Sequence, residues 1–86
     1  MGPLPTITVY TLPVCVQCKL TKRKLDELGL SYEVADLSAP ELADKLADFK
    51  ARGLLSAPIV VADARHLDGD LAEWSGYRPD LLEALA

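Results

Sequence analysis

The only two cysteines of this 86-residue chain lie in Cys15-Val16-Gln17-Cys18, at the junction between an extended segment and a helical one. Residues 6–11 alternate β-branched and aromatic side chains and predict a strand, while residues 19–28 are rich in strong helix formers. Cys15 is therefore expected at or just before the N-terminus of a helix, with Cys18 one turn further in. This arrangement predicts a strand, a turn at 12–14 and a helix, with two neighbouring thiols at the turn.

The expected positions give the two thiols different roles. At a helix N-terminus, unpaired backbone N–H groups and the positive end of the helix dipole favour a thiolate over a thiol. Cys18 is expected to be more shielded, because the following turn covers it. We therefore predict that Cys15 attacks a substrate disulfide and that Cys18 resolves the mixed disulfide by displacing the reduced product.

A C-x-x-C pair can also be half of a zinc site. Such a site needs four ligands, and after the two cysteines the sequence offers only His66 as a nitrogen ligand. A protein-only site would therefore need a carboxylate or a second chain. We expect no metal and no other cofactor, and we expect His66 to be an exposed loop residue. In a reducing compartment, two cysteines at this spacing are more often catalytic than structural.

Composition and charge exclude several classes of protein. Half of the residues are hydrophobic and 26% are charged, which is typical of a globular chain, and at this length residues 1–86 are expected to form one domain. The net charge of −4 argues against a general nucleic-acid binder. Four of the nine basic residues nevertheless gather on the first predicted helix, as a solvated face or as a positive collar that attracts an acidic partner. They are Lys19, Lys22, Arg23 and Lys24.

The sequence carries no signal for a membrane or for export. No apolar run reaches the 18 residues that a membrane span needs. The N-terminus also lacks a basic region followed by an apolar one. We therefore expect a cytoplasmic protein whose partners include neither a membrane nor a nucleic acid.

The next elements follow from periodicity and from turn residues. Gly29 ends the first helix, and residues 31–36 alternate as a second strand, so the two strands are expected to be parallel with a right-handed connection. Residues 38–41 read as a capping box, which opens a second helix that runs to about Arg52. Its core-facing side is expected to consist of Leu42, Leu46 and Phe49.

The last third of the chain predicts two strands and a helix. Residues 59–62 form a short, fully apolar strand, and Asp68-Gly69-Asp70 is the clearest turn in the connection that follows. A fourth strand is expected near 71–74. Residues 79–85 predict a short helix with proline in its first turn and its leucines facing inward.

The resulting α/β order, β-α-β-α-β-β-α, resembles the thioredoxin fold in its minimal glutaredoxin form. The resemblance covers nearly the whole chain, with C-x-x-C after the first strand and Ala57-Pro58 before the third. It implies a four-stranded mixed sheet flanked by three helices. It also implies a cis peptide before Pro58, which faces the dithiol, and a backbone at Ala57 that pairs with substrate as an added strand.

Two motifs narrow the resemblance to one family. C-x-Q-C at 15–18 and W-S-G-Y-R-P-D at 74–80 are similar to the signatures of NrdH-type redoxins, which have glutaredoxin-like sequences and thioredoxin-like activity. The resemblance implies a monomeric thiol-disulfide oxidoreductase of deoxyribonucleotide synthesis. Such a protein takes electrons from thioredoxin reductase and reduces the disulfide in the large subunit of class Ib ribonucleotide reductase.

The same resemblance implies which residues meet the partners. Residues 74–78 are expected to form a fixed, hydrogen-bonded segment beside the dithiol that contributes to recognition of the reductase. The complete set of expected partner-binding residues is Thr11, Pro13, Val16, Gln17, Ala57, Pro58, Trp74, Ser75, Gly76, Tyr77 and Arg78.

Departures from glutaredoxins argue against a glutathione site. Leu12, Gln17 and Arg78 stand where glutaredoxins bind glutathione with a lysine, an aromatic residue and an acidic residue. Without those groups the charges of glutathione are poorly paired, so its binding is expected to be weak. Two alternative functions require bound glutathione: that of a glutathione-dependent glutaredoxin, and that of a carrier that holds an iron-sulfur cluster between two chains.

The sequence also departs from NrdH-type redoxins in two places. Leu12 replaces the lysine that is common in that family, and the connection from Val61 to Trp74 is longer than in that family.

Overall fold

A four-stranded mixed sheet forms the centre of the computed structural model, which describes residues 5–86. The strands are β1 (Thr6–Thr11), β2 (Glu33–Asp36), β3 (Ile59–Asp63) and β4 (Leu71–Ser75). Their spatial order is β2-β1-β3-β4, with β1 parallel to β2 and β3 antiparallel to both of its neighbours. Residues 1–4, part of the stretch searched for an export signal, lie outside the described residues.

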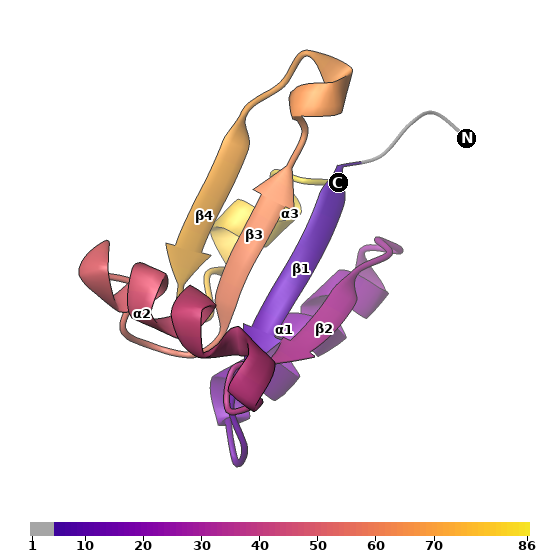
Figure 1. Cartoon of the computed structure of the whole chain (residues 1–86). Helices are drawn as coiled ribbons and strands as arrows, with labels where there is room; N and C mark the ends of the chain where they lie inside the picture. The colour runs from indigo at the N-terminus through magenta and orange to yellow at the C-terminus, as the bar shows by residue number, and fades with distance from the viewer. Residues whose placement is uncertain (1–4) are drawn as a thin grey trace.

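Three α-helices cover the two faces of this sheet. They are α1 (Val16–Glu27), α2 (Ala43–Ala51) and α3 (Pro79–Glu83), and short 3-10 turns occur at Pro40–Leu42 and Arg65–Leu67. Figure 1 shows α1 and α3 behind the sheet and α2 in front of it. The predicted element order, including the parallel pair β1 and β2, is confirmed. Across residues 5–86, no helix is long and apolar enough to cross a bilayer.

The core divides into two clusters because strand side chains alternate between faces. Ile7, Val9, Val60, Leu25 and Leu82 belong to the cluster under α1 and α3. The neighbouring strand positions Tyr10 and Ile59 pack instead with Phe49 of α2. Both faces of β3 are therefore covered, which explains why residues 59–62 contain no polar side chain.

The predicted capping box at 38–41 is wrong. The hydroxyl and the N–H of Ser38 donate to Asp36 Oδ1, at 2.6 and 2.8 Å, and these hydrogen bonds lower the pKa of Asp36. Because Ser38 is held in this turn, it cannot cap the following helix. The chain instead makes the 3-10 turn at 40–42 without a side-chain cap, and α2 begins at Ala43.

The second strand begins two residues later than predicted, at Glu33. Tyr32 is turned towards α1, where its hydroxyl donates to Asp26 Oδ1 at 3.0 Å, and its ring packs on the larger core cluster. Tyr32 is thereby used for helix packing rather than for pairing with β1.

The connection between β3 and β4 forms the end of the sheet opposite the β1–α1 loop (Figure 1). It contains the 3-10 turn at Arg65–Leu67 and the left-handed residue Asp68, with a φ of 62°. Arg65 donates to the carboxylate of Asp63 and lowers the pKa of that carboxyl to about 2. The predicted turn and fourth strand are confirmed, and His66 is exposed as predicted.

Candidate active site

Cys15 and Cys18 form a disulfide at the N-terminus of α1, with their Cα atoms 5.2 Å apart. Cys15 is the N-cap residue with an extended backbone, and Cys18 lies in the first turn, as predicted. The Cys18 N–H donates to Cys15 Sγ at 3.1 Å. The sulfur thus occupies the place that a serine or aspartate oxygen usually takes, where it satisfies one of the N–H groups that a helix start leaves unpaired.

The two sulfur-bearing residues differ in their access to solvent. Cys15 is half-buried, whereas Cys18 is only 3% exposed. Thr21, one turn after Cys18, is fully buried and donates its hydroxyl to the Gln17 carbonyl at 2.9 Å. A reactant that approaches the disulfide from outside therefore reaches Cys15 more easily than Cys18.

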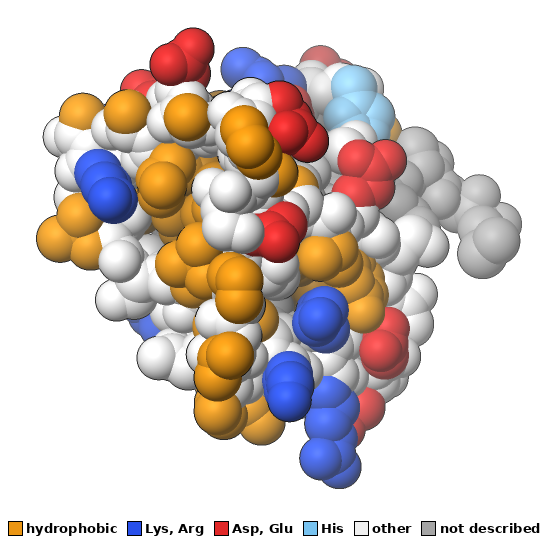
Figure 2. Space-filling model, turned by 60° about the horizontal axis from the view of Figure 1, so that its bottom comes forward, with side chains coloured by type: hydrophobic (Ala, Val, Ile, Leu, Met, Phe, Trp, Pro, Cys, Tyr) orange, Lys and Arg blue, Asp and Glu red, His pale blue; other side chains and the backbone are white. Residues whose placement is uncertain are grey.

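Exposed apolar side chains surround Cys15. We call Leu12, Val14 and Val16 the dithiol face, because they lie on either side of Cys15, in the β1–α1 loop and at the first position of α1, and all three are exposed. Figure 2 views this end of the molecule and shows hydrophobic side chains gathered on it, with Lys and Arg side chains beside them. The sequence predicted partner contacts for Pro13 and Val16 but none for Leu12 or Val14. Apolar residues at alternate positions of a predicted loop were the signal that could have revealed this surface.

The segment after β4 is tied to the first turn of α1. The Tyr77 N–H donates to Gln17 Oε1 at 2.9 Å across 60 positions of sequence. The preceding N–H, of Gly76, donates to the Pro58 carbonyl at 2.8 Å. Two consecutive backbone groups therefore connect this segment to Gln17 and to Pro58, so that the predicted hydrogen-bonded segment beside the dithiol is present.

Gly76 has a physical reason to be glycine. Its φ is 83°, a conformation that L side chains rarely adopt, and an added Cβ would lie 3.2 Å from Gln17 Oε1. Gly76→Ala should therefore lower the free energy of unfolding by about 1–2 kcal/mol. Thermal unfolding followed by circular dichroism measures this loss. Gly53→Ala is the matched control for the backbone effect alone, because its φ is 80° and an added Cβ would meet nothing within 4 Å. If both substitutions destabilise equally, the contact with Gln17 contributes nothing.

The peptide bond between Ala57 and Pro58 is cis, as the resemblance implied. Pro58 is buried immediately before β3, and Ala57 is half-buried. Neither the N–H nor the carbonyl of Ala57 makes a backbone hydrogen bond to any described residue. The backbone of Ala57 is therefore able to pair with another chain.

Trp74 and Ser75 end the edge strand β4, where they pair with Val60 and Ile59. Trp74 is buried in the larger core cluster, and its Nε1–H has no hydrogen-bond partner among residues 5–86. Thr11 ends β1 and accepts the Leu37 N–H at 2.8 Å. Pro13 is exposed in the β1–α1 loop.

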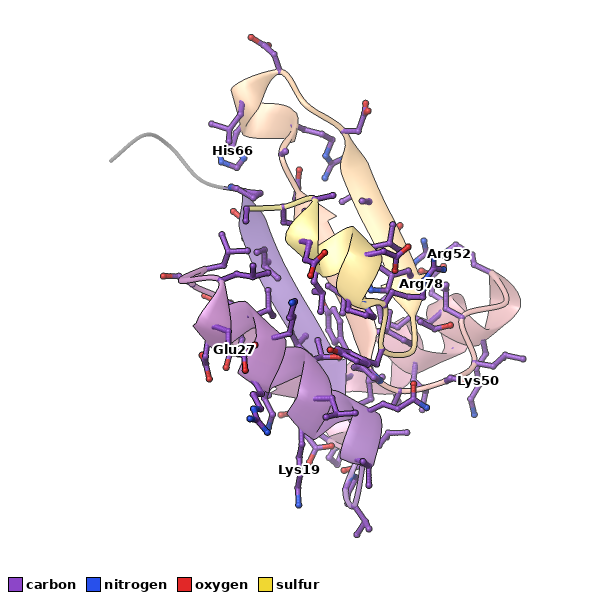
Figure 3. All side chains as sticks on the ribbon, turned by 180° about the vertical axis from the view of Figure 1, so that it is seen from behind. Lys19, Glu27, Lys50, Arg52, His66 and Arg78 are labelled. Carbon is purple, nitrogen blue, oxygen red and sulfur yellow. A yellow bond between two sulfur atoms is a disulfide. The ribbon has the colours of Figure 1, made fainter. Side chains whose placement is uncertain are left out.

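Arg78 is not joined to the dithiol by any hydrogen bond or ion pair among the described residues. It is the N-cap residue of α3, and it pairs with Asp80 at 2.9 Å, which lowers the pKa of that carboxyl. Figure 3 places Arg78 at α3, well away from Lys19 on the first helix.

The basic residues of α1 divide into two groups. Lys24 pairs with Glu83 at 2.8 Å, which raises the pKa of Lys24, and Arg23 pairs with Glu27 at 3.3 Å. Lys19 and Lys22 make no ion pair within residues 5–86. Lys19 and Lys22 are therefore the unpaired members of the possible positive collar, and Lys19 directly follows Cys18. No group of three or more His, Cys, Asp and Glu side chains within the described residues could hold a metal ion.

Comparisons with known proteins agree with one another. The Glutaredoxin family profile matches residues 7–67. The glutaredoxin-like protein NrdH of Salmonella typhimurium is 40% identical over 81 residues, which span 93% of this chain and 88% of that protein. The gene 56 protein of mycobacteriophage L5 is 33% identical and covers 92% of this chain and 70% of its own length.

Solved structures give the same result in three dimensions. The NrdH-redoxin of Escherichia coli, described as a glutaredoxin-like protein with a thioredoxin-like activity profile, superposes with a TM-score of 0.78. It is 33% identical, and the match covers 94% of this chain and 95% of that one. A glutaredoxin of Archaeoglobus fulgidus superposes with a TM-score of 0.70 at 26% identity, over 94% of this chain and 85% of its own.

Proposed function

This chain belongs to the NrdH-type redoxins of the glutaredoxin family, and from that premise we propose that it is the dithiol electron donor of a ribonucleotide reductase. It has the thioredoxin-like fold of that family and is a thiol-disulfide oxidoreductase with Cys15 and Cys18 as its redox-active pair. The proposal concerns the partners: thioredoxin reductase as the source of electrons, and the large subunit of class Ib ribonucleotide reductase as their destination. It further holds that residues 1–86 act as one cytoplasmic, monomeric domain without a cofactor.

The proposed reaction transfers two electrons by two thiol-disulfide exchanges. The Cys15 thiolate attacks one sulfur of the partner disulfide, which breaks that bond, forms a mixed disulfide and releases one partner thiolate. The Cys18 thiolate then attacks Cys15 Sγ. This second step forms the Cys15–Cys18 disulfide and releases the other partner thiolate. A dithiol of the reductase reverses both steps and restores the reduced chain.

The geometry around the sulfurs supports this order of attack. Cys15 is the more exposed of the two, and the Cys18 N–H lies 3.1 Å from its sulfur. After reduction, the same N–H and the N-terminal end of α1 favour a thiolate on Cys15. Cys18, being buried, is placed to attack only the neighbouring sulfur.

The observation that carries the proposal is the hydrogen bond from the Tyr77 N–H to Gln17 Oε1. Gln17 stands where glutaredoxins have the aromatic residue of C-P-Y-C, and Tyr77 belongs to the second NrdH signature. The bond thus joins the two motifs that separate NrdH-type redoxins from glutathione-dependent proteins. On this basis we assign partner contacts to residues 15–18 and to residues 74–78, including Arg78.

An extended segment of the partner is proposed to lie across the Ala57 backbone. The free N–H and carbonyl of Ala57 support this role, because they can continue the sheet by pairing with an added strand. Thr11, Pro13 and Val16 lie where β1 leads into α1, and we assign the opposite side of the partner segment to Pro58. A partner disulfide held between these two sides would be presented to Cys15.

A two-reductant assay tests the proposal. The oxidised protein is mixed with NADPH and thioredoxin reductase, or with NADPH, glutathione and glutathione reductase, and the loss of NADPH is followed. Turnover is expected with thioredoxin reductase. The missing charge-assisted bonds to glutathione, each about 1.5–3 kcal/mol, should make the glutathione reaction at least about tenfold slower.

Cys15→Ser is the control for both reactions, because it removes the attacking thiol and should leave only background NADPH loss. Faster turnover with glutathione than with thioredoxin reductase would favour a glutaredoxin. A coloured protein with the mass of two chains would favour an iron-sulfur carrier.

A further inference from the structure

Val14 combines two properties that the fold itself does not explain. Its φ is 54°, in the left-handed region, and its side chain is 101% exposed. Valine suits neither condition, because its branched Cβ is crowded in the left-handed region and its methyl groups gain nothing from facing water. Asp68, the one other non-glycine residue with positive φ within residues 5–86, is of a type that tolerates this conformation.

Core packing does not account for Val14. It belongs to neither of the two hydrophobic clusters, and its complete exposure means that no described residue covers it. Asparagine or glycine at this position would relieve the backbone and suit the solvent. The free protein therefore gains no stability from this valine.

Val14 lies directly beside the residue that reacts with a partner. It immediately precedes Cys15, so their Cα atoms are only about 3.8 Å apart. In the mixed disulfide the Cys15 sulfur lies about 2.05 Å from a sulfur of the partner. A protein partner that comes this close necessarily covers the residues beside Cys15. A small disulfide has no surface large enough to do so.

We propose that Val14 is a specificity-determining residue, whose side chain fills an apolar recess of the protein partner beside the partner cysteine that forms the mixed disulfide with Cys15. Leu12 and Val16 extend the same apolar contact on either side of it. The left-handed backbone presents Val14 at the edge of the loop, where it is the most exposed of the three. This inference rests on the proposed function for the identity of the partner, thioredoxin reductase.

Val14→Asn tests the inference, because it should change stability and partner activity in opposite directions. Relief of the left-handed valine should raise Tm by about 4 °C. Loss of the apolar contact should lower kcat/KM with thioredoxin reductase about tenfold, mainly through a higher KM. The single-turnover rate of the reduced variant with hydroxyethyl disulfide should stay within about twofold of the wild-type rate.

Two further variants serve as controls. Val14→Ile keeps an apolar branched side chain and should retain kcat/KM with the reductase within about threefold. Leu71→Asn removes an exposed apolar side chain at the start of β4, paired with Asp63 at the end of the sheet opposite Cys15, and should leave both rates unchanged.

The outcomes distinguish this inference from the proposed function. If the wild-type protein does not turn over with thioredoxin reductase, the proposed partner is wrong, and the same variants are compared on insulin disulfides with dithiothreitol as reductant. A loss of activity by Val14→Asn that is confined to that protein substrate would still support the inference.

Two outcomes overturn the inference. The first is equal activity of Val14→Asn and wild type on the protein disulfide. The second is an equal loss on hydroxyethyl disulfide, because Val14 would then act on the dithiol itself.

Discussion

A Cys18→Ser variant will accumulate a mixed disulfide with its protein partner, whereas Cys15→Ser will form none. Attack requires the more accessible sulfur, at the N-cap of α1, and Cys15 provides it. Cys18 is 3% exposed and can only complete a reaction that Cys15 has begun. Steady-state turnover with thioredoxin reductase should fall by a factor on the order of 10³ or more in both variants, because serine is a far weaker nucleophile than a thiolate.

The trapped species is measured by non-reducing electrophoresis and by the mass of the covalent adduct. Treatment with dithiothreitol should release the adduct of Cys18→Ser, which shows that it is a disulfide. The Cys15→Ser/Cys18→Ser double variant is the control for non-specific association. Equal trapping by the two single variants, or trapping through Cys18 alone, would refute the assigned roles.

Phe49→Ala should produce the largest loss of stability of the substitutions considered. Phe49 is completely buried, and its ring meets the Tyr10 ring edge-on with centroids 5.0 Å apart. The Lys45 ammonium and the Arg52 guanidinium lie 5.7 and 5.3 Å from its centroid. Truncation should therefore lower the free energy of unfolding by about 3–5 kcal/mol, and Tm by at least about 12 °C.

Urea denaturation followed by circular dichroism measures this loss. Leu55→Ala is the matched control, because Leu55 lies just after α2 but is 72% exposed, and its truncation should change stability by no more than about 0.5 kcal/mol. A loss below about 1.5 kcal/mol for Phe49→Ala would mean that α2 is held on the sheet by other contacts. Activity should fall with the folded fraction, since α2 precedes the loop that carries Ala57 and Pro58.

Periodicity predicted most of the fold because the apolar positions of this chain follow its elements closely. Alternation in 6–11 and the unbroken apolar run 59–62 gave β1 and β3, and both predictions are confirmed. The capping box failed because Asp36 competes for the Ser38 hydroxyl. That competition depends on how β2 ends, and a local pattern does not contain this information.

Less of the candidate site could be predicted from local sequence patterns. The bond between Gln17 and Tyr77 spans 60 positions, and only the paired motifs indicated that the two segments belong together. The left-handed conformation of Val14 was missed for the opposite reason: residue preferences assign such positions to glycine, asparagine or aspartate. A residue that contradicts its local preference can be recognised only once the backbone is known.

The strand β1 begins, and the helix α3 leads to Ala86, at the end of the sheet opposite the dithiol face (Figure 1). A tether attached after Ala86 therefore leaves Cys15 pointing away from its support. The protein can therefore be immobilised on an electrode through its C-terminus without the dithiol face being covered. It can equally be fused through a flexible linker after Ala86 to the N-terminus of a reductase. In such a fusion, linker length would set the local concentration of one disulfide near the other, and so the rate at which electrons pass between them.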